Sequence, residues 1–213
     1  MKLTALQYLQ LDSPHMITTS SPPEILLAPD NLKRWTVEEY HRLSEVGLLS
    51  PIERTELIAG QIILMAAKGT PHVTALRLLA LQFDEFLRNQ PYFASTQDPV
   101  QLNDLSEPEP DLAIVKGDAL TYASRHPQPE DVRLIVEVAD STLNQDCNVK
   151  DKAYAEANIA EYWVLDLKHQ QLHIFQGPTD AGYNSHLILS KNNQVSPLAF
   201  PELTLSISSL FAP

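Results

Sequence analysis

Two carboxylates stand inside apolar segments near the middle of the chain. Asp111 precedes the apolar run 112–115, and Glu137 lies within the apolar run 134–138. Short runs of this kind are typical of strands that are covered on both faces. An ionised carboxylate in such a strand is costly unless it binds a metal, pairs with a cation or takes part in chemistry. The two residues therefore predict a divalent-cation site that handles phosphate.

If the two strands are neighbours, Asp111 and Glu137 could hold Mg²⁺ or Mn²⁺, which prefer oxygen ligands. The backbone carbonyl of Val138 is a candidate for the third ligand. Such a cation polarises a phosphodiester and lowers the pKa of a bound water. Two other interpretations stay open: Asp111 as a turn residue after Pro110, and Glu137 as one half of a buried pair with lysine or arginine.

A nearby ammonium group would stabilise the negative charge that develops on the phosphate. Asp146, Lys150 and Tyr154 lie four residues apart on a predicted helix and share one face. Lys150 is therefore the first candidate, and Lys152 is the second. Taken alone, the Asp146–Lys150 spacing more often marks an ordinary exposed ion pair.

Periodicity and turn residues predict a mixed α/β sheet with helices on its faces. A capping box at Thr36 and Glu39 begins the first helix, and Thr70 is the predicted cap of the second. The predicted helices span residues 36–46, 70–88 and 146–158. The predicted strands span residues 56–58, 61–65, 92–97, 99–103, 111–115, 132–138, 162–165, 172–175 and 185–189. The acidic stretch 98–111 contains no basic residue and is typical of a solvated loop.

Composition narrows the class of protein. Of 213 residues, 27 are acidic and 15 are basic, and a formal charge of −12 argues against avid nucleic-acid binding. The single cysteine, Cys147, excludes an internal disulfide or a cysteine-rich zinc site and suits a reducing cytoplasm. His72 lies in the first turn of the predicted helix 70–88, where it could bind substrate or water or be an ordinary histidine of the helix start. The remaining histidines show no metal-ligand spacing. We expect a proline-rich N-terminal arm over residues 1–30 and a single domain over residues 31–213.

Four blocks of sequence together resemble the Uma-two family of restriction-endonuclease-like proteins, within the PD-(D/E)XK nuclease superfamily. They are Pro110-Asp111, Glu137-Val138-Ala139-Asp140-Ser141-Thr142, Asp146-x-x-x-Lys150-x-x-x-Tyr154-Ala155 and Glu161-Tyr162-Trp163-Val164-Leu165-Asp166. The resemblance implies a restriction-endonuclease-like core and an enzyme that uses Mg²⁺ or Mn²⁺ to hydrolyse DNA. Separately from the resemblance, we expect a cytoplasmic protein and a homodimer.

The resemblance also assigns roles. It implies that Asp111 and Glu137 bind the metal and that Glu56 matches the first acidic position of the fold. In the superfamily, a lysine stands two places after the position of Glu137, where this chain has Ala139. In the Uma-two family this lysine is expected on the following helix, and Lys150 matches that position best.

Two other functions stay open from the sequence. The chain could be a catalytically weak or inactive interaction module on a nuclease fold, which the acidic charge and the missing Glu-x-Lys pattern favour. It could also be a metal-dependent phosphoesterase acting on small nucleotides, whose binding depends less on a basic surface.

Overall fold

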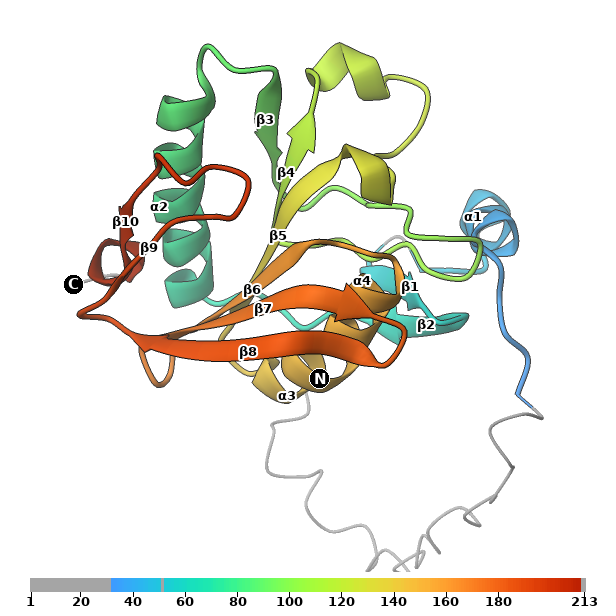
Figure 1. Cartoon of the computed structure of the whole chain (residues 1–213). Helices are drawn as coiled ribbons and strands as arrows, with labels where there is room; N and C mark the ends of the chain where they lie inside the picture. Colours follow the sequence, from blue (N-terminus) through green and yellow to red (C-terminus); the bar gives the residue numbers. More distant parts are fainter. Residues whose placement is uncertain (1–31, 51, 212–213) are drawn as a thin grey trace, which may run out of the picture. The chain divides into compact units, whose positions relative to one another are not determined.

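A six-stranded mixed sheet is the framework of the described chain (Figure 1). The computed structural model describes residues 32–50 and 52–211, so the predicted arm 1–30 lies outside the described residues. The strand order is β3-β4-β5-β6-β7-β8, with β5 and β6 parallel and the other neighbours antiparallel. The strands of this sheet are β3 (Tyr92–Ser95), β4 (Leu112–Lys116), β5 (Val132–Ala139), β6 (Glu161–Asp166), β7 (Gln171–Thr179) and β8 (Gly182–Ser190). The predicted α/β class is confirmed.

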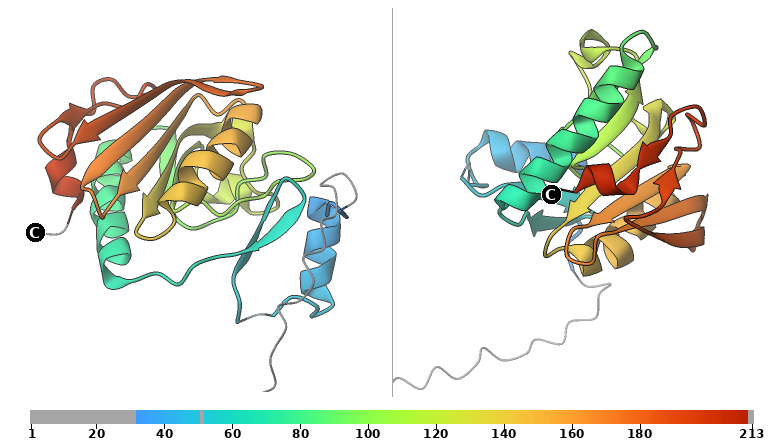
Figure 2. Two further views of the ribbon diagram at one scale, coloured as in Figure 1. Left: turned by 90° about the horizontal axis from the view of Figure 1, so that it is seen from below. Right: turned by 90° about the vertical axis from the view of Figure 1, so that its left-hand side faces the viewer.

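The central strands are buried on both faces, as their apolar sequences predict. In β5, Leu134, Val136 and Val138 face a core that contains α2 (Thr70–Leu87). Ile135 of the same strand faces a second core that contains residues of α4 (Asp151–Glu156). The two helices therefore cover opposite faces of the sheet (Figure 2). A side chain such as Glu137, on the α4 face, has little access to bulk water except at the strand end.

The predicted N-terminal helix is present as α1 (Val37–Glu45), and its capping box at Thr36 and Glu39 is formed. The predicted second helix begins one residue earlier than its sequence indicates. Gly69 is the N-cap of α2 and Pro71 lies in its first turn, so Thr70 is the first helical residue and not the cap.

The parallel pairing of β5 with β6 requires a crossover, because parallel neighbours cannot be joined by a tight hairpin. The crossover consists of α3 (Leu143–Gln145), a π-helical turn over Asp146–Lys150 and α4. The predicted helix 146–158 is thus one part of a longer, irregular helical segment. Widened helical turns of this type often occur at functional sites, and this one carries Lys150 towards β5.

A separate hairpin carries Glu56. Strands β1 (Thr55–Ile58) and β2 (Gln61–Leu64) pair around Ala59 and Gly60, as predicted. The Gly60 amide donates to the carbonyl of Leu105 at 2.7 Å, and the Gly60 carbonyl accepts from the amide of Trp35 at 2.8 Å. The turn therefore connects the hairpin to two distant segments of the chain.

The long connection between β3 and β4 differs from its prediction. Residues 99–103 form only an isolated bridge, between Asn103 and Ser106, and not a strand. The acidic stretch is also not solvated throughout, since Val100, Glu107 and Asp111 are buried. Its burial follows from contact with β1, where Leu57 and Glu107 exchange backbone hydrogen bonds.

The rest of the described chain is built from short elements. A small pair of strands closes its C-terminal part, β9 (Gln194–Val195) with β10 (Leu205–Ser206). The 3-10 helices are η3 (Ala119–Tyr122), η4 (Pro129–Asp131) and η6 (Ile207–Leu210). Among the described residues, no helix has the length and apolar character needed to cross a membrane.

Candidate active site

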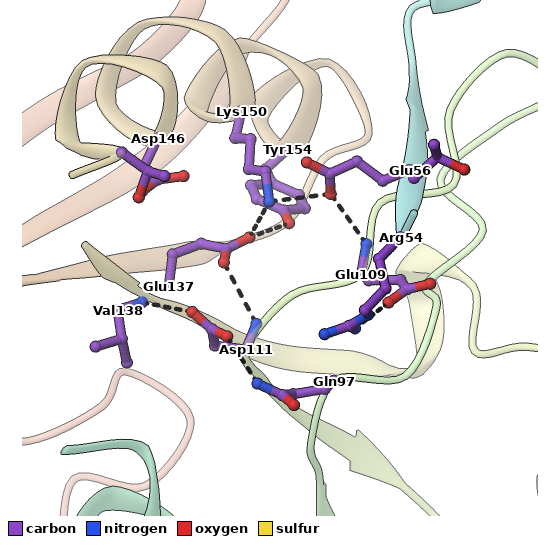
Figure 3. Close-up of polar contacts among 12 residues, drawn as sticks. Arg54, Glu56, Gln97, Glu109, Asp111, Glu137, Val138, Asp146, Lys150 and Tyr154 are labelled. Carbon is purple, nitrogen blue, oxygen red and sulfur yellow. Dashed lines mark hydrogen bonds and ion pairs between the residues drawn. The ribbon is translucent and has the colours of Figure 1, made fainter. Parts of the chain in front are cut away.

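Strand pairing brings Asp111 and Glu137 together. Leu112 of β4 lies opposite Val136 of β5, so Asp111 and Glu137 stand side by side where the pairing ends. The Asp111 amide donates to Glu137 Oε2 at 3.3 Å, and the Val138 amide donates to Asp111 Oδ2 at 2.9 Å (Figure 3). Each carboxylate is therefore held by the backbone next to the other.

Lys150 reaches this pair from the crossover. Its Nζ lies 2.9 Å from Glu137 Oε1 and 3.0 Å from Glu56 Oε2, and its side chain is 6 % exposed. The Tyr154 hydroxyl, one turn further along, donates to Glu137 Oε1 at 3.0 Å. The interpretation of Asp146–Lys150 as an exposed surface pair is therefore wrong. Lys152 is exposed and lines a different pocket.

Glu56 belongs to the same network but contacts Lys150 and not Asp111. It is buried in β1, and besides Lys150 its Oε2 accepts from the amide of Glu109 at 3.2 Å. Arg54 forms an ion pair with the side chain of Glu109 next to it. The hairpin thus holds Glu56 on one side of the Lys150 ammonium group, and Glu137 lies on the other side.

The second oxygen of Asp111 has partners that are less apparent from sequence. His72 Nε2 lies 3.0 Å from Asp111 Oδ1, and Gln97 donates to the same oxygen at 3.2 Å. The ammonium group of Lys68 lies 3.5 Å from it. His72 was a candidate because of its place in the first turn of α2. Lys68 and Gln97 were missed, because both belong to irregular connections and no local pattern marks them.

The charges of the site shift its pKa values. Burial raises the pKa of Glu137 to about 8, and the ammonium of Lys150 only partly opposes this. Burial alone would also raise the pKa of Asp111, but His72, the hydrogen bond from the Val138 amide and the charge of Lys68 together outweigh it, so that this pKa is lowered. Burial would lower the pKa of Lys150, yet Glu137 and Glu56 hold it above its usual range. Lys150 therefore keeps its charge, and Asp111 is ionised.

A cavity of about 60 Å³ opens onto this network. Its volume suffices for several water molecules. Two lysines line it, Lys68 and Lys150. The carboxylates that line it are Glu56, Glu109, Asp111, Glu137, Asp140 and Asp146. This excess of carboxylates over ammonium groups favours a bound cation.

The donor set fits a hard divalent cation at Asp111 and Glu137. A carboxylate offers about four lone-pair positions, and hydrogen bonds use three on each residue, which leaves one on Asp111 Oδ2 and one on Glu137 Oε2. Among the described residues, the carboxylates of this cavity do not place three ligand atoms within 4.8 Å of one another. Lys150 lies between Glu56 and Glu137, which leaves Asp111 and Glu137 as the available pair.

Comparisons with known proteins agree with this fold. A solved structure titled as "a putative nuclease belonging to DUF820", from Anabaena variabilis, matches with a TM-score of 0.63 and 14% sequence identity. The match covers 83% of this chain and 97% of the other, and at this identity it shows the fold alone. No curated protein matches the sequence.

The family comparison goes further than the structural one. The model of the Uma2 (Uma-two) family, described as "Putative restriction endonuclease", matches residues 37–208. The match includes each of the four blocks of sequence that carry the resemblance. Because it also spans most of the chain, the protein belongs to the Uma2 family.

Proposed function

We propose that this protein is a divalent-cation-dependent endonuclease that hydrolyses phosphodiester bonds in DNA. One observation carries the proposal: the ammonium of Lys150 lies 2.9 Å from Glu137, although Ala139 occupies the strand position of the superfamily lysine. Two acids and a lysine thus converge in one cavity even though the lysine comes from a helix. The family to which the chain belongs supports a nuclease activity.

The residues take distinct roles in this proposal. Asp111, Glu137 and the carbonyl of Val138, all of which line the cavity, hold Mg²⁺ or Mn²⁺. A cation held there would polarise the phosphodiester and lower the pKa of an attacking water. Lys150 has three donor hydrogens, of which two are directed to Glu137 and Glu56. Its third donor serves the phosphate or the attacking water, and Glu56 positions Lys150.

Lys68 adds a second cationic group on the other side of Asp111. Its Nζ is buried and has no hydrogen-bond partner among the described residues, although it lies 3.5 Å from Asp111 Oδ1. A phosphate oxygen in the cavity would supply that partner. We therefore assign Lys68 to substrate binding in the same proposal.

The acidic pair is tested by Asp111→Asn and Glu137→Gln, which keep side-chain size and remove charge. We expect each to lower cleavage of plasmid DNA in Mn²⁺ by at least about 100-fold and to weaken Mn²⁺ binding measured by titration calorimetry. The control is Asp84→Asn, an exposed carboxylate on α2 outside the cavity. Undiminished cleavage in both variants would remove the site assignment. A wild type that neither binds Mn²⁺ nor cuts DNA would favour the interaction module.

The lysine is tested by comparing Lys150→Met with Lys152→Met, two positions on the same helical segment. We expect a loss of cleavage for the first and wild-type rates for the second, since Lys152 is exposed and outside the cavity. Lys150→Met also leaves two buried carboxylates unpaired, which costs about 3–5 kcal/mol of stability. The rates are therefore compared at a temperature where circular dichroism shows both variants folded. Equal rates for the two variants would contradict the role of Lys150.

Two finer properties, a homodimer and a cytoplasmic location, stay predictions. The location is consistent with a single, partly buried cysteine. The pKa of its thiol is raised to about 12 by burial. Cys147 therefore stays protonated and unreactive under ordinary conditions.

A further inference from the structure

A second group of potential ligands lies outside the cavity. His41 of α1, Glu107 of the β3–β4 connection and His126 of the loop before η4 form a group that we call the His–Glu–His cluster. One ligand atom from each residue lies within 4.8 Å of the other two. His41 Nε2 is 2.6 Å from Glu107 Oε1, and the two imidazole rings meet edge to face with their centroids 6.4 Å apart.

Glu107 is the unusual member of the cluster. Its side chain is 3 % exposed, and within the described residues its Oε2 has no hydrogen-bond partner. A buried carboxylate oxygen without a partner is costly, and such groups are rare in folded proteins. The backbone amide and carbonyl of Glu107 each form a hydrogen bond with Leu57 of β1, and these two bonds fix the residue in place. The unpaired oxygen is therefore a built-in feature of the fold and points to a ligand.

The cluster is distinct from the candidate active site. Glu107 lies only two residues from Glu109, but its side chain pairs with His41 of α1. Glu109 pairs with Arg54 and lines the active-site cavity, whereas none of the three cluster residues lines it. A metal in the cluster would thus be additional to the one proposed at Asp111 and Glu137.

We propose that His41, Glu107 and His126 bind a Zn²⁺ ion. Two imidazole nitrogens and one carboxylate oxygen form a donor set typical of zinc, with water in the fourth position. Mg²⁺ prefers oxygen ligands and would not be favoured here. Zinc bonds of about 2.0–2.2 Å put tetrahedral ligands about 3.3 Å apart. The 2.6 Å contact between His41 and Glu107 must therefore lengthen, and His126 must lie at a similar distance from both. The His41 side chain is 46 % exposed and free to adjust.

The position of the cluster indicates what the ion does. Val37 is the only buried residue of helix α1. The hydrogen bonds that attach the helix to its neighbours include those from the Val37 amide to the Asp104 carbonyl and from the Tyr40 hydroxyl to the Thr55 carbonyl. A metal held by His41, Glu107 and His126 would fasten α1 to two loops. One of these loops continues through Glu109 to Asp111, so the ion would stabilise the segment that leads into the active site.

The test is a zinc titration of metal-free protein in competition with a chromophoric chelator. We expect the wild type to bind one equivalent of Zn²⁺. The affinity for this ion should fall by at least about tenfold in each of the variants Glu107→Gln, His41→Gln and His126→Gln. Co²⁺ in place of Zn²⁺ should give the visible absorption of a tetrahedral site, and the same variants should lose it. The melting temperature of the wild type should rise with Zn²⁺.

Two controls make the result specific. His169→Gln removes a comparable histidine–carboxylate pair, since His169 Nδ1 lies 2.6 Å from Asp166 Oδ2, and it should bind as the wild type does. Asp111→Asn should also retain this zinc site, which separates the cluster from the proposed nuclease metal. Failure of the wild type to bind Zn²⁺, or equal binding by the wild type and Glu107→Gln, would overturn the proposal. His41→Gln changes an exposed side chain and keeps the test valid if a Glu107 variant does not fold.

Discussion

Glu137 is the residue on which the polar contacts of the active site converge. Its Oε1 accepts from Lys150 and Tyr154, and its Oε2 accepts from the amide of Asp111. Four donors would saturate both oxygens, and only three are present. The raised pKa of Glu137 comes first from its burial, and the negative charges of Asp111, Asp146 and Glu56 add to it.

The raised pKa of Glu137 predicts a pH dependence of stability in metal-free protein. A carboxyl group whose pKa rises from 4.5 to about 8 on folding stabilises the fold fully below about pH 4.5, and the contribution is lost as pH rises through 8. Wild-type unfolding free energy should therefore fall between about pH 6.5 and 8.5 more steeply than that of Glu137→Gln, by at most about 1.4 kcal/mol per pH unit. Urea unfolding in EDTA measures both slopes.

The pH range is chosen to isolate Glu137. Asp146 has a pKa raised by burial to about 6 and would add a slope of the same sign at lower pH. The pKa of Asp111 is lowered, so this residue does not titrate in the range. Parallel slopes for wild type and Glu137→Gln would show that Glu137 is already ionised at neutral pH. Mn²⁺ should flatten the wild-type slope, because the cation takes the place of the proton.

Part of the site could be predicted at the level of single residues. The cost of placing a carboxylate in an apolar strand singles out Asp111 and Glu137, and helical spacing places Lys150 and Tyr154 on one face. Lys68 and Gln97 could not be found in this way, because they approach Asp111 through irregular segments whose course depends on tertiary packing. The histidines of the His–Glu–His cluster were dismissed for a similar reason, since the three ligands come from three separate elements.

At the scale of elements, the β1–β2 hairpin deserves a test because it holds Glu56 against Lys150. Gly60 has a φ of +78°, and a Cβ added there would lie 2.7 Å from the Cβ of Arg34. Gly60→Ala should therefore cost about 2–3 kcal/mol, from backbone strain and from displacement of the neighbouring segment. It should also lower cleavage by shifting Glu56. Thermal unfolding and the DNA cleavage assay provide the two measurements.

Gly47 supplies the matched control for the hairpin. It has a similar φ of +72°, but an added Cβ would meet nothing within 4 Å. Gly47→Ala should cost only the backbone strain, about 1 kcal/mol, and leave cleavage unchanged. Equal destabilisation by the two substitutions would mean that the contact with Arg34 relaxes without cost.

Most elements follow from their sequences, and the exceptions have physical causes. Alternating and continuous apolar runs predict β1, β2 and β4 to β8, and in β4 to β7 the apolar residues of these runs are buried in the sheet. Residues 99–103 have a similar composition, yet their backbone bonds to residues 106–108 of the same loop, for example from the Leu102 amide to the Ser106 carbonyl. The π-helical turn at Asp146–Lys150 leaves no mark in the spacing of apolar residues, because it is fixed by how α4 packs on the sheet.

At the scale of the whole molecule, the charge of −12 limits how DNA can bind. Affinity for DNA depends on the number of phosphates that are neutralised, and each contributes about 0.9 to the slope of log affinity against log salt. With only Lys68 and Lys150 lining the cavity, we expect a shallow slope of about −2. The protein should therefore engage DNA at one place and not along an extended surface.

Lys68→Gln tests this local binding. In a Glu137→Gln background, where the DNA is not cut, the substitution should reduce the salt slope by about one and weaken binding to all sequences alike. Fluorescence anisotropy over a series of KCl concentrations measures both effects. The control is Lys191→Gln, which changes an exposed lysine that donates a hydrogen bond to Gln170. It should leave the salt slope unchanged. An unaltered slope in Lys68→Gln would place the phosphate contact elsewhere.

The crossover that carries Lys150 also has a consequence for the order in which the chain folds. β4 and β5 are antiparallel and consecutive strands, whereas the parallel partner β6 follows only after the whole crossover. We therefore expect β4 and β5 to pair first, at the lower entropic cost. The two carboxylates therefore meet before the ammonium group arrives to offset their repulsion. We expect the closing of the crossover, which brings Lys150 to the two carboxylates, to limit the refolding rate. Divalent cations should accelerate refolding, so that the cation of the proposed nuclease reaction would also act as a folding cofactor.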